Sequence, residues 1–274
     1  MPAYDYTTVG HVTIDVLADG TRQPGGTAFY SALQAARLGL RALIVTQGDP
    51  PEIEALLAPY REELNLSVIP AAHTTTLQTD HYGGERRQRV LAWAGPLGEE
   101  IEVDTAILHL APVARETPRR WLGRADFVGL TPQGLVRRWD VSGEITLAPL
   151  RPELLPARGD AWVLNEREHA RCAESLARTV AAGTLAAITN GAEPTTLLVP
   201  GREPNQIPVP VLAAPTDDLG AGDVFAAAFF VALFEHQPPP WAATFAAAAA
   251  AVRVEGMGPG AIGDRAAIEA RRRL

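Results

Sequence analysis

The chain has 274 residues, of which 47% are hydrophobic and 20% charged, a composition typical of a globular protein with one substantial core. Its formal net charge of −8 argues against a nucleic-acid or membrane partner, since both favour basic patches. No apolar run reaches transmembrane length, the N-terminus lacks a signal-peptide pattern, and Cys172 is the single cysteine; we therefore expect a cytoplasmic protein.

All 24 basic residues are arginines. Phosphate loops of the G-x-x-x-x-G-K-[ST] type, protein kinases and Schiff-base enzymes each need a lysine. The sequence therefore excludes these lysine-based mechanisms.

The first part of the chain alternates predicted strands and helices. Residues 11–17 form a strand-like segment, and residues 27–40 carry apolar side chains at helical spacing, with Gly39 as a stop signal. The next predicted elements are a strand at 41–47, a helix at 52–64 and a strand at 65–70. This β-α-β-α-β order predicts a parallel sheet with right-handed crossovers.

Residues 72–94 interrupt that order. Polar and apolar residues alternate on both sides of Gly83-Gly84, which predicts a β-hairpin. A hairpin inside an α/β chain is expected to project as a flap.

The alternation resumes after this flap. Predicted strands lie at 106–110, 124–130, 161–165 and 185–189, with a helix at 166–183, edge strands at 195–200 and 205–211, and helices near 221–235, 241–254 and 264–272. No repeat or interdomain linker is evident, so we expect one domain, 1–274.

The segment DDLGAGDVFAAAF, residues 217–229, places a carboxylate at the start of a helix that is apolar all round and therefore buried. The first amides of a helix lack intrahelical partners and carry the positive end of its dipole. Gly220 and Gly222 let a ligand approach, so these amides can hold an anion. Asp223 beside them can accept a hydroxyl proton, an arrangement suited to phosphoryl transfer. The alternative is that Asp223 only caps the helix.

This segment resembles the C-terminal signature of the ribokinase-like (PfkB) carbohydrate kinases, D-T-x-G-A-G-D-x-F. PGGTAFYSALQAARLG, residues 24–39, is similar to their N-terminal signature. Further motifs resemble the family in the same order: NEREH (165–169), ITNGAEPTTLLV (188–199) and VEGMGPGAIG (254–263). The resemblance implies a three-layer α/β/α sandwich around a mostly parallel sheet, with a β-flap lid, and an ATP-dependent kinase acting on a hydroxyl.

The resemblance also implies a catalytic site at the start of this helix. Asp223 would be the general base, and the amides of Gly220, Ala221 and Gly222 would form the anion hole that stabilises charge on the moving phosphate.

On the donor side, the resemblance implies that Asn165 and Glu168 organise Mg²⁺ and the phosphates of ATP. Water would mediate these contacts, because Mg²⁺ retains much of its hydration. The other implied nucleotide-binding residues are Thr189, Gly191, Gly258 and Gly260. A capping box on NERE remains the alternative for Asn165 and Glu168.

On the acceptor side, the implied substrate-binding residues are Asp15, Gly25, Gly26, Gln133 and Arg137. A carboxylate such as Asp15 can accept two hydroxyl hydrogen bonds, which suits a polyol, although a turn residue is the alternative. Residues 11–32 and 131–140 are similar to the subgroup that contains inositol kinases, which favours an inositol-like polyol. Arg137 could neutralise phosphate charge or remain solvated.

Two differences from the family pattern leave alternatives open. Tyr30 stands where many members carry an asparagine that contacts the sugar. Asp218 and Leu219 replace the usual threonines, which weakens any inference of a monovalent-cation site.

The lid also differs. Only ten positions separate Asp15 from Gly25, where typical sugar kinases of this family insert lid strands. We therefore expect a reduced lid from about 16–24 and 72–94, relying mainly on the second segment. Weaker closure, or closure by a partner subunit in a homodimer, would follow.

The sequence thus predicts an ATP- and Mg²⁺-dependent kinase for a polyol, sugar or nucleoside. The alternative is a non-catalytic nucleotide or sugar binder that keeps the fold, motivated by the altered signature and the reduced lid.

Overall fold

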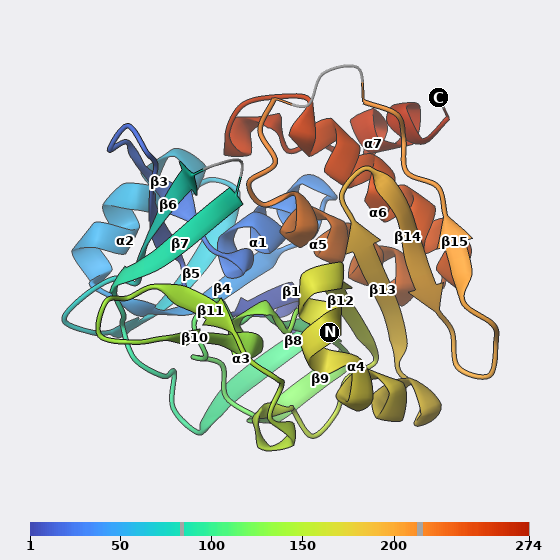
Figure 1. The fold of residues 1–274 in the computed structure, drawn as a ribbon, viewed down its shortest axis with the longest axis horizontal. Helices are drawn as coiled ribbons and strands as arrows, with labels where there is room; N and C mark the ends of the chain where they lie inside the picture. Colours follow the sequence, from blue (N-terminus) through green and yellow to red (C-terminus); the bar gives the residue numbers. More distant parts are fainter. Residues whose placement is uncertain (83–84, 213–215, 274) are drawn as a thin grey trace.

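The structure, a computed structural model, describes residues 1–82, 85–212 and 216–273, with the backbone alone at 80–82, 85 and 86. A nine-stranded sheet forms its centre (Figure 1). In spatial order the strands are β15 (Asn205–Ile207), β14 (Glu193–Leu198), β13 (Leu185–Asn190), β12 (Ala161–Asn165), β9 (Arg120–Leu130), β8 (Glu100–Leu110), β1 (Tyr4–Val9), β4 (Ala42–Gly48) and β5 (Leu64–Pro70). Neighbouring strands are parallel except at the pairs β13–β14 and β14–β15.

Helices cover both faces of this sheet. On one face lie α1 (Thr27–Arg37), α2 (Pro50–Leu57), α5 (Ala221–Phe234), α6 (Pro239–Val254) and α7 (Arg265–Arg272); on the other lie α3 (Gln133–Val136) and α4 (Glu166–Ala181). The α5 helix is buried from Val224 to Ala232, as its uninterrupted apolar sequence predicts. The fold is the α/β/α sandwich that the sequence predicts. None of the described helices is long and apolar enough to cross a membrane.

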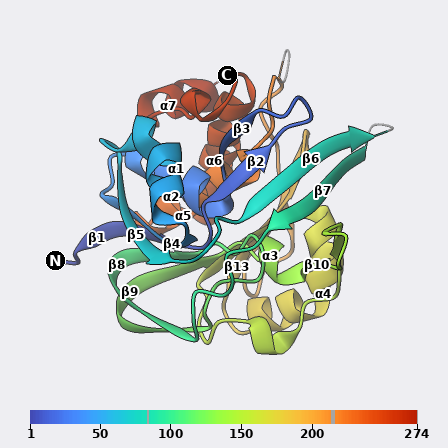
Figure 2. The same ribbon diagram turned by 90° about the vertical axis from the view of Figure 1, so that its left-hand side faces the viewer.

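A four-stranded second sheet forms the lid, in the order β3 (Arg22–Gly25), β2 (Thr13–Val16), β6 (Thr76–Tyr82) and β7 (Glu85–Ala92). The β6–β7 hairpin projects from the body in Figure 2. The predicted turn at Gly83-Gly84 lies outside the described residues. Half of the lid strands come from the short β2–β3 hairpin, whereas the sequence pointed mainly to 72–94. The strand predicted at 11–17 corresponds to β2, which lies in this lid and not in the parallel sheet; the strand that the sheet contains here is β1, which was not predicted.

The chain passes between body and lid at positions that contact one another. The Thr75 hydroxyl hydrogen-bonds Nδ1 of His11 at 2.7 Å and accepts the amide hydrogen of Ala94 at 3.0 Å. The buried Glu116 carboxylate accepts the His11 amide at 2.9 Å. A Cβ on Gly26 would lie 2.3 Å from the His11 carbonyl oxygen, so only glycine allows this approach. These contacts join the entry and exit points of both lid hairpins.

Several element boundaries differ from those predicted. The α2 helix begins earlier, because the Asp49 side chain caps it by accepting the Glu52 amide and Pro50 occupies its first turn. It ends at Leu57, where a 3₁₀ turn containing Pro59 follows. The strands predicted at 106–110 and 124–130 both extend backwards. The added part of β8 alternates exposed and buried residues, whereas that of β9 holds only exposed and half-buried ones. A two-stranded sheet of β10 (Arg137–Trp139) and β11 (Ile145–Leu147) was not anticipated.

Candidate active site

Charged side chains from separate elements converge around Asp223, in the first turn of α5. Asp223 remains partly exposed, yet burial raises the pKa of its carboxyl to about 7. The negative charges of Glu168 and Asp15 act in the same direction, while the Thr27 hydroxyl and Arg137 oppose them. A carboxyl with this pKa is poised to accept a proton near neutral pH.

The amides in front of Asp223 are partly available to a ligand. Gly220 adopts a left-handed conformation, with φ of 79°, and forms the N-cap of α5. In the described part of the chain, the amides of Gly220 and Gly222 have no hydrogen-bond acceptor. The Ala221 amide already donates to the Asp218 carbonyl oxygen at 3.1 Å. The predicted three-amide anion hole is therefore corrected to two open amides, because a local turn uses the third.

Asn165 and Glu168 form the capping box that was the alternative to their predicted ligand role. The Asn165 side chain accepts the Glu168 amide at 2.9 Å, and the Glu168 carboxylate accepts the amide and side-chain hydrogens of Asn165 at 3.0 and 2.9 Å. Burial raises the pKa of Glu168, against these hydrogen bonds and the nearby Arg137. Both roles are compatible, since carboxylate oxygens have further lone pairs.

The residues present suit a hydrated magnesium ion better than a fully coordinated one. In the described residues, no cluster of three or more His, Cys, Asp or Glu side chains could hold a metal ion. Glu168 offers carboxylate oxygens at the carboxyl end of β12, and Mg²⁺ commonly binds one or two carboxylates together with water and substrate phosphates. Glu168, with Asn165 orienting it, fits such an ion.

The acceptor-side residues Asp15 and Gly25 lie in the lid sheet itself, on β2 and β3. Asp15, in β2, is 4% exposed, and the Thr13 hydroxyl donates to its Oδ1 at 2.7 Å. A Cβ on Gly25 would lie 2.2 Å from Asp15 Oδ2. We expected Gly25 and Gly26 to admit a substrate. In this structure Gly25 leaves room for the Asp15 carboxylate, and Gly26 leaves room for the His11 carbonyl oxygen. Their glycine requirement therefore arises within the protein itself.

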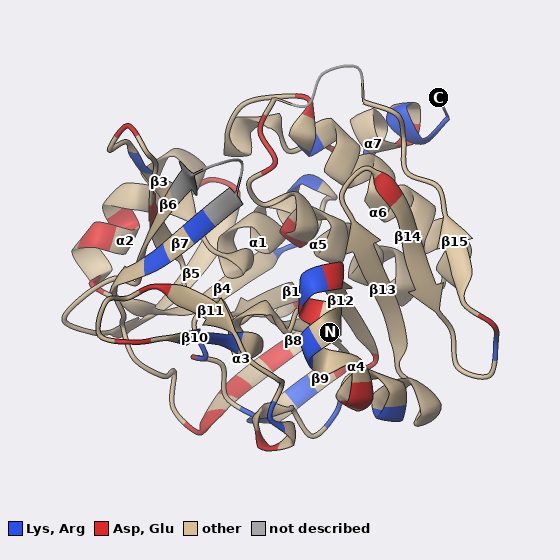
Figure 3. Ribbon diagram, in the orientation of Figure 1, with Lys and Arg blue, Asp and Glu red and all other residues tan. Residues whose placement is uncertain are grey.

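Gln133 and Arg137 share a hollow of about 280 Å³ with Asn165 and Glu168. Arg137 is 6% exposed and donates to the Val113 carbonyl oxygen and to Gln88 Oε1, each at 2.9 Å. It is therefore not the solvated arginine of the alternative interpretation. Other lining residues were not predicted as site residues: Arg87, Gln88, Glu144, Ile145, Leu147 and Arg167. Figure 3 shows basic residues along β7 and mixed charges at the start of α4.

Of the predicted nucleotide-binding residues, Asn165 and Glu168 line this hollow, whereas Thr189, Gly191, Gly258 and Gly260 lie outside it. Thr189 is near the end of β13, and Gly191 follows with φ of 56°. The Gly258 amide donates to Asp217 Oδ2 at 3.0 Å, and the Gly260 carbonyl oxygen accepts from Arg37 at 3.3 Å. The loop that carries these last two glycines is thus held by side chains from two directions.

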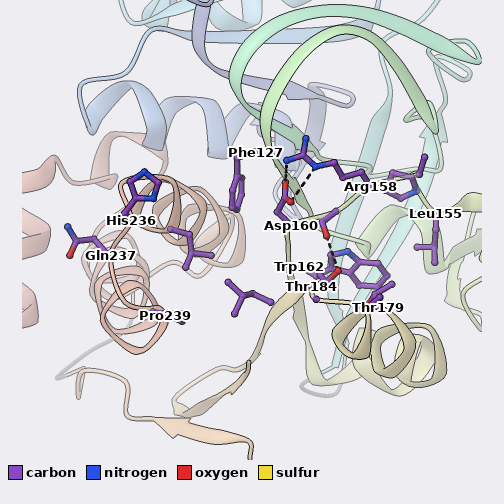
Figure 4. A pocket seen from close by; sticks show the side chains of 17 residues that line it. Phe127, Leu155, Arg158, Asp160, Trp162, Thr179, Thr184, His236, Gln237 and Pro239 are labelled. Atoms are coloured by element: carbon purple, nitrogen blue, oxygen red, sulfur yellow. Dashed lines mark hydrogen bonds and ion pairs between the residues drawn. The ribbon is translucent and has the colours of Figure 1, made fainter. Parts of the chain in front are cut away.

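A second hollow lies at the opposite, amino edge of the sheet; it is larger than the one beside Arg137 and contains none of the predicted residues (Figure 4). It has a volume of about 760 Å³ and is bordered by Phe127, Trp162 and His236. Arg158 and Asp160 form an ion pair within it, at 2.8 Å. Its polar side chains are largely satisfied, so size alone does not identify the functional site.

Residues 157–264 match the family model described as pfkB family carbohydrate kinase. A comparison with proteins of curated function gives no significant match.

Solved structures resemble the fold over almost the whole chain. A pyrophosphate-dependent kinase in the ribokinase family, complexed with a pyrophosphate analog and myo-inositol, has a TM-score of 0.77 and 20% identity, covering 97% of this chain and 99% of its own. The Arabidopsis thaliana ribokinase complexed with ribose and ATP has a TM-score of 0.74 and 20% identity, covering 99% of each chain. The Methanocaldococcus jannaschii nucleoside kinase has a TM-score of 0.76 and 16% sequence identity, and the match covers 99% of each chain.

Residues 157–264 thus resemble the pfkB family of carbohydrate kinases, and solved structures of ribokinase-family proteins share the fold over almost the whole chain.

Proposed function

We propose that this kinase transfers the γ-phosphate of ATP, with Mg²⁺, to a hydroxyl of an inositol-like polyol. Asp223 takes the proton from the attacking hydroxyl, and the open amides of Gly220 and Gly222 stabilise charge on the moving phosphoryl group. The observation that carries the proposal is the Asp223 carboxyl, with a pKa of about 7, directly beside those amides.

The acceptor proposal rests on polar groups in and near the lid. Asp15 offers a buried carboxylate, and Gln133 and Arg137 line the neighbouring hollow with amide and guanidinium groups. A ring bearing several hydroxyls matches this mixture of acceptors and donors. The kinase that binds myo-inositol among the similar folds agrees with this choice.

The donor has a specific alternative. Three of the similar structures are of a pyrophosphate-dependent kinase or a variant of one, whereas others are complexed with ATP. Both donors present a polyphosphate that can meet the α5 amides, and they differ in the nucleoside. The Gly191 and Gly258 positions proposed for that nucleoside have open space around their Cα hydrogens.

The test is a turnover assay with purified protein and Mg²⁺. ATP and pyrophosphate are each combined with myo-inositol, other polyols, sugars and nucleosides, for wild type and Asp223→Asn. We expect polyol phosphorylation with ATP that falls by about two to four orders of magnitude in the variant. Turnover with pyrophosphate alone would reassign the donor. Nucleotide binding without turnover on any acceptor would instead support the non-catalytic alternative.

A further inference from the structure

Arg253, in the last turn of α6, has a side chain with no solvent exposure. Its guanidinium donates to Asp217 Oδ2 at 2.7 Å, to the Asp217 carbonyl oxygen at 3.2 Å and to the Gly256 carbonyl oxygen at 3.1 Å. The guanidinium carbon also lies 5.7 Å from the centre of the Tyr30 ring. Burying a cation this completely is costly, so a structural arrangement must depend on it.

Asp217 connects this buried cation to both loops of the proposed donor site. Its Oδ1 accepts the Leu219 amide at 3.0 Å, within the turn that leads to the open amides, and its Oδ2 accepts the Gly258 amide at 3.0 Å. Burial opposes ionisation of Asp217, but the hydrogen bonds from Arg253 and these amides outweigh it and lower its pKa. The Arg253–Asp217 ion pair therefore connects the turn at Leu219 with the loop at Gly258.

Tyr30 completes the arrangement from below. A Cβ on Gly220 would fall 2.4 Å from its ring, so the turn rests directly on the aromatic surface. The Tyr30 hydroxyl and Arg253 Nε are both buried and, among the described residues, make no hydrogen bond of regular geometry. Burial raises the pKa of Tyr30, and the nearby Arg253 side chain opposes this shift. Buried polar groups left unpaired are uncommon in native structures and indicate a constraint other than stability.

We propose that Arg253 is a positioning residue for phosphoryl transfer, a resident cation that holds the Gly220–Gly222 amides in register with the loop at Gly258. This inference rests on the proposed kinase function. The cation acts through Asp217 and the backbone and does not touch the substrate. Because one carboxylate and two carbonyl oxygens surround it, a dissociable monovalent cation is not required at this position.

The three oxygen atoms that accept hydrogen bonds from Arg253 make the proposal testable, because a soluble cation can take the place of the deleted guanidinium group. Shortening Arg253 to alanine removes the charge and leaves three oxygen acceptors around a cavity. Free guanidinium has the same planar donor geometry as the deleted group and can refill such a cavity. A side chain that mattered only for packing would not be replaced by a soluble cation.

The experiment compares wild type, Arg253→Ala and Arg158→Ala, with and without non-denaturing guanidinium chloride. Arg158 is the matched control, because it also binds one carboxylate, of Asp160, and two carbonyl oxygens, of Ala125 and Asp126, but at the opposite edge of the sheet. In Arg253→Ala we expect kcat to fall by about 10–100-fold with little change in acceptor KM, as expected for misplaced catalytic groups. Guanidinium should restore much of this loss and raise the melting temperature of that variant alone.

A second readout does not depend on turnover. Inorganic pyrophosphate should raise the melting temperature of wild type and Arg158→Ala, but that of Arg253→Ala only when guanidinium is present. If wild type lacks kinase activity, the proposed function fails while this measurement still tests the role of Arg253.

Three outcomes would overturn the proposal. The first is an Arg253→Ala protein with wild-type kcat and pyrophosphate response. The second is a loss that guanidinium does not repair. The third applies if Arg253→Ala does not fold: Arg253→Lys, which keeps the charge but not the planar donor set, should then lose at least about tenfold in kcat, and an unchanged kcat in that variant contradicts the proposal.

Discussion

The charged side chains at the two edges of the central sheet differ in their pairing and in their pKa. At the amino edge, Arg158 and Asp160 are partly exposed and paired with each other and with backbone groups. At the carboxyl edge, Asp223 has a pKa raised to about 7 and Glu168 has a raised pKa. The larger of the two hollows is at the amino edge, yet the carboxyl groups with a raised pKa are at the carboxyl edge. Carboxyl groups with a shifted pKa are therefore a better guide to a candidate active site than the size of a cavity.

Glycine substitutions should separate the edges most strongly. Gly220→Ala would force its Cβ to 2.4 Å from the Tyr30 ring in a left-handed conformation, so the open amides must move. We expect a loss of about 10²–10³-fold in kcat, comparable to removing an oxyanion-hole donor. Gly183→Ala, at the amino-edge hollow, also has a positive φ but meets no atom within 4 Å, and should lose only about 1 kcal/mol of stability. Equal kinetic losses in both variants would contradict this difference.

Removing one acid from each ion pair should give the next largest contrast. Asp217→Asn leaves Arg253, whose side chain is 0% exposed, without its counter-charge, and should lower the free energy of unfolding by about 3–5 kcal/mol. Asp160→Asn affects a pair whose side chains are 33% and 47% exposed, and should lower it by about 1 kcal/mol. Denaturant titration of both variants measures the difference. A loss for Asp217→Asn no larger than for Asp160→Asn would show that the buried pair is not a structural node.

The pH dependence of turnover should report the raised pKa of Asp223. The base acts when ionised, so kcat/KM should fall roughly tenfold per pH unit as the pH drops below about 7. For stability the sign is opposite. Because the folded-state pKa is raised, this group favours folding at low pH and loses that contribution as pH rises through about 7. Asp223→Asn should therefore gain most relative stability at alkaline pH, and pH-independent kinetics would argue against Asp223 as the base.

Two tyrosine substitutions should give the smallest effect and the finest comparison. Tyr30→Phe removes a hydroxyl that makes no hydrogen bond of regular geometry among the described residues. Its unfolding equilibrium constant and its kcat should therefore each stay within about twofold of the wild-type values. Tyr6→Phe removes a buried hydroxyl that hydrogen-bonds His109 Nδ1 at 2.9 Å, and should cost about 1–2 kcal/mol. A large kinetic loss in Tyr30→Phe would mean that this hydroxyl contacts a ligand.

Local sequence patterns were sufficient to predict the start of α5. Its apolar run, the Gly220 and Gly222 spacing and the position of Asp223 are all encoded within a few residues. The capping box at Asn165 and Glu168 was likewise predictable as an alternative, because its partners are three positions apart. Features of this kind follow from the geometry of a single helix end.

Contacts between distant segments were not predictable in this way. Arg253 looks like an ordinary basic residue in the last turn of a helix, a favourable place for any cation, and its partner Asp217 precedes it by 36 positions. Gln88 reaches Arg137 from the lid, across 49 positions. Such pairs depend on how elements pack, which one sequence does not specify.

The contacts of His11, Thr75, Ala94 and Gly26 also bear on how the lid can move. All four passages between body and lid meet at these residues, through hydrogen bonds and one close backbone approach. The β2–β3 and β6–β7 hairpins are consequently joined at one place and should move together as one rigid unit. A molecule that touches only β7 would then also reposition Asp15 on β2, so that arrival of the acceptor and alignment of its carboxylate become one event.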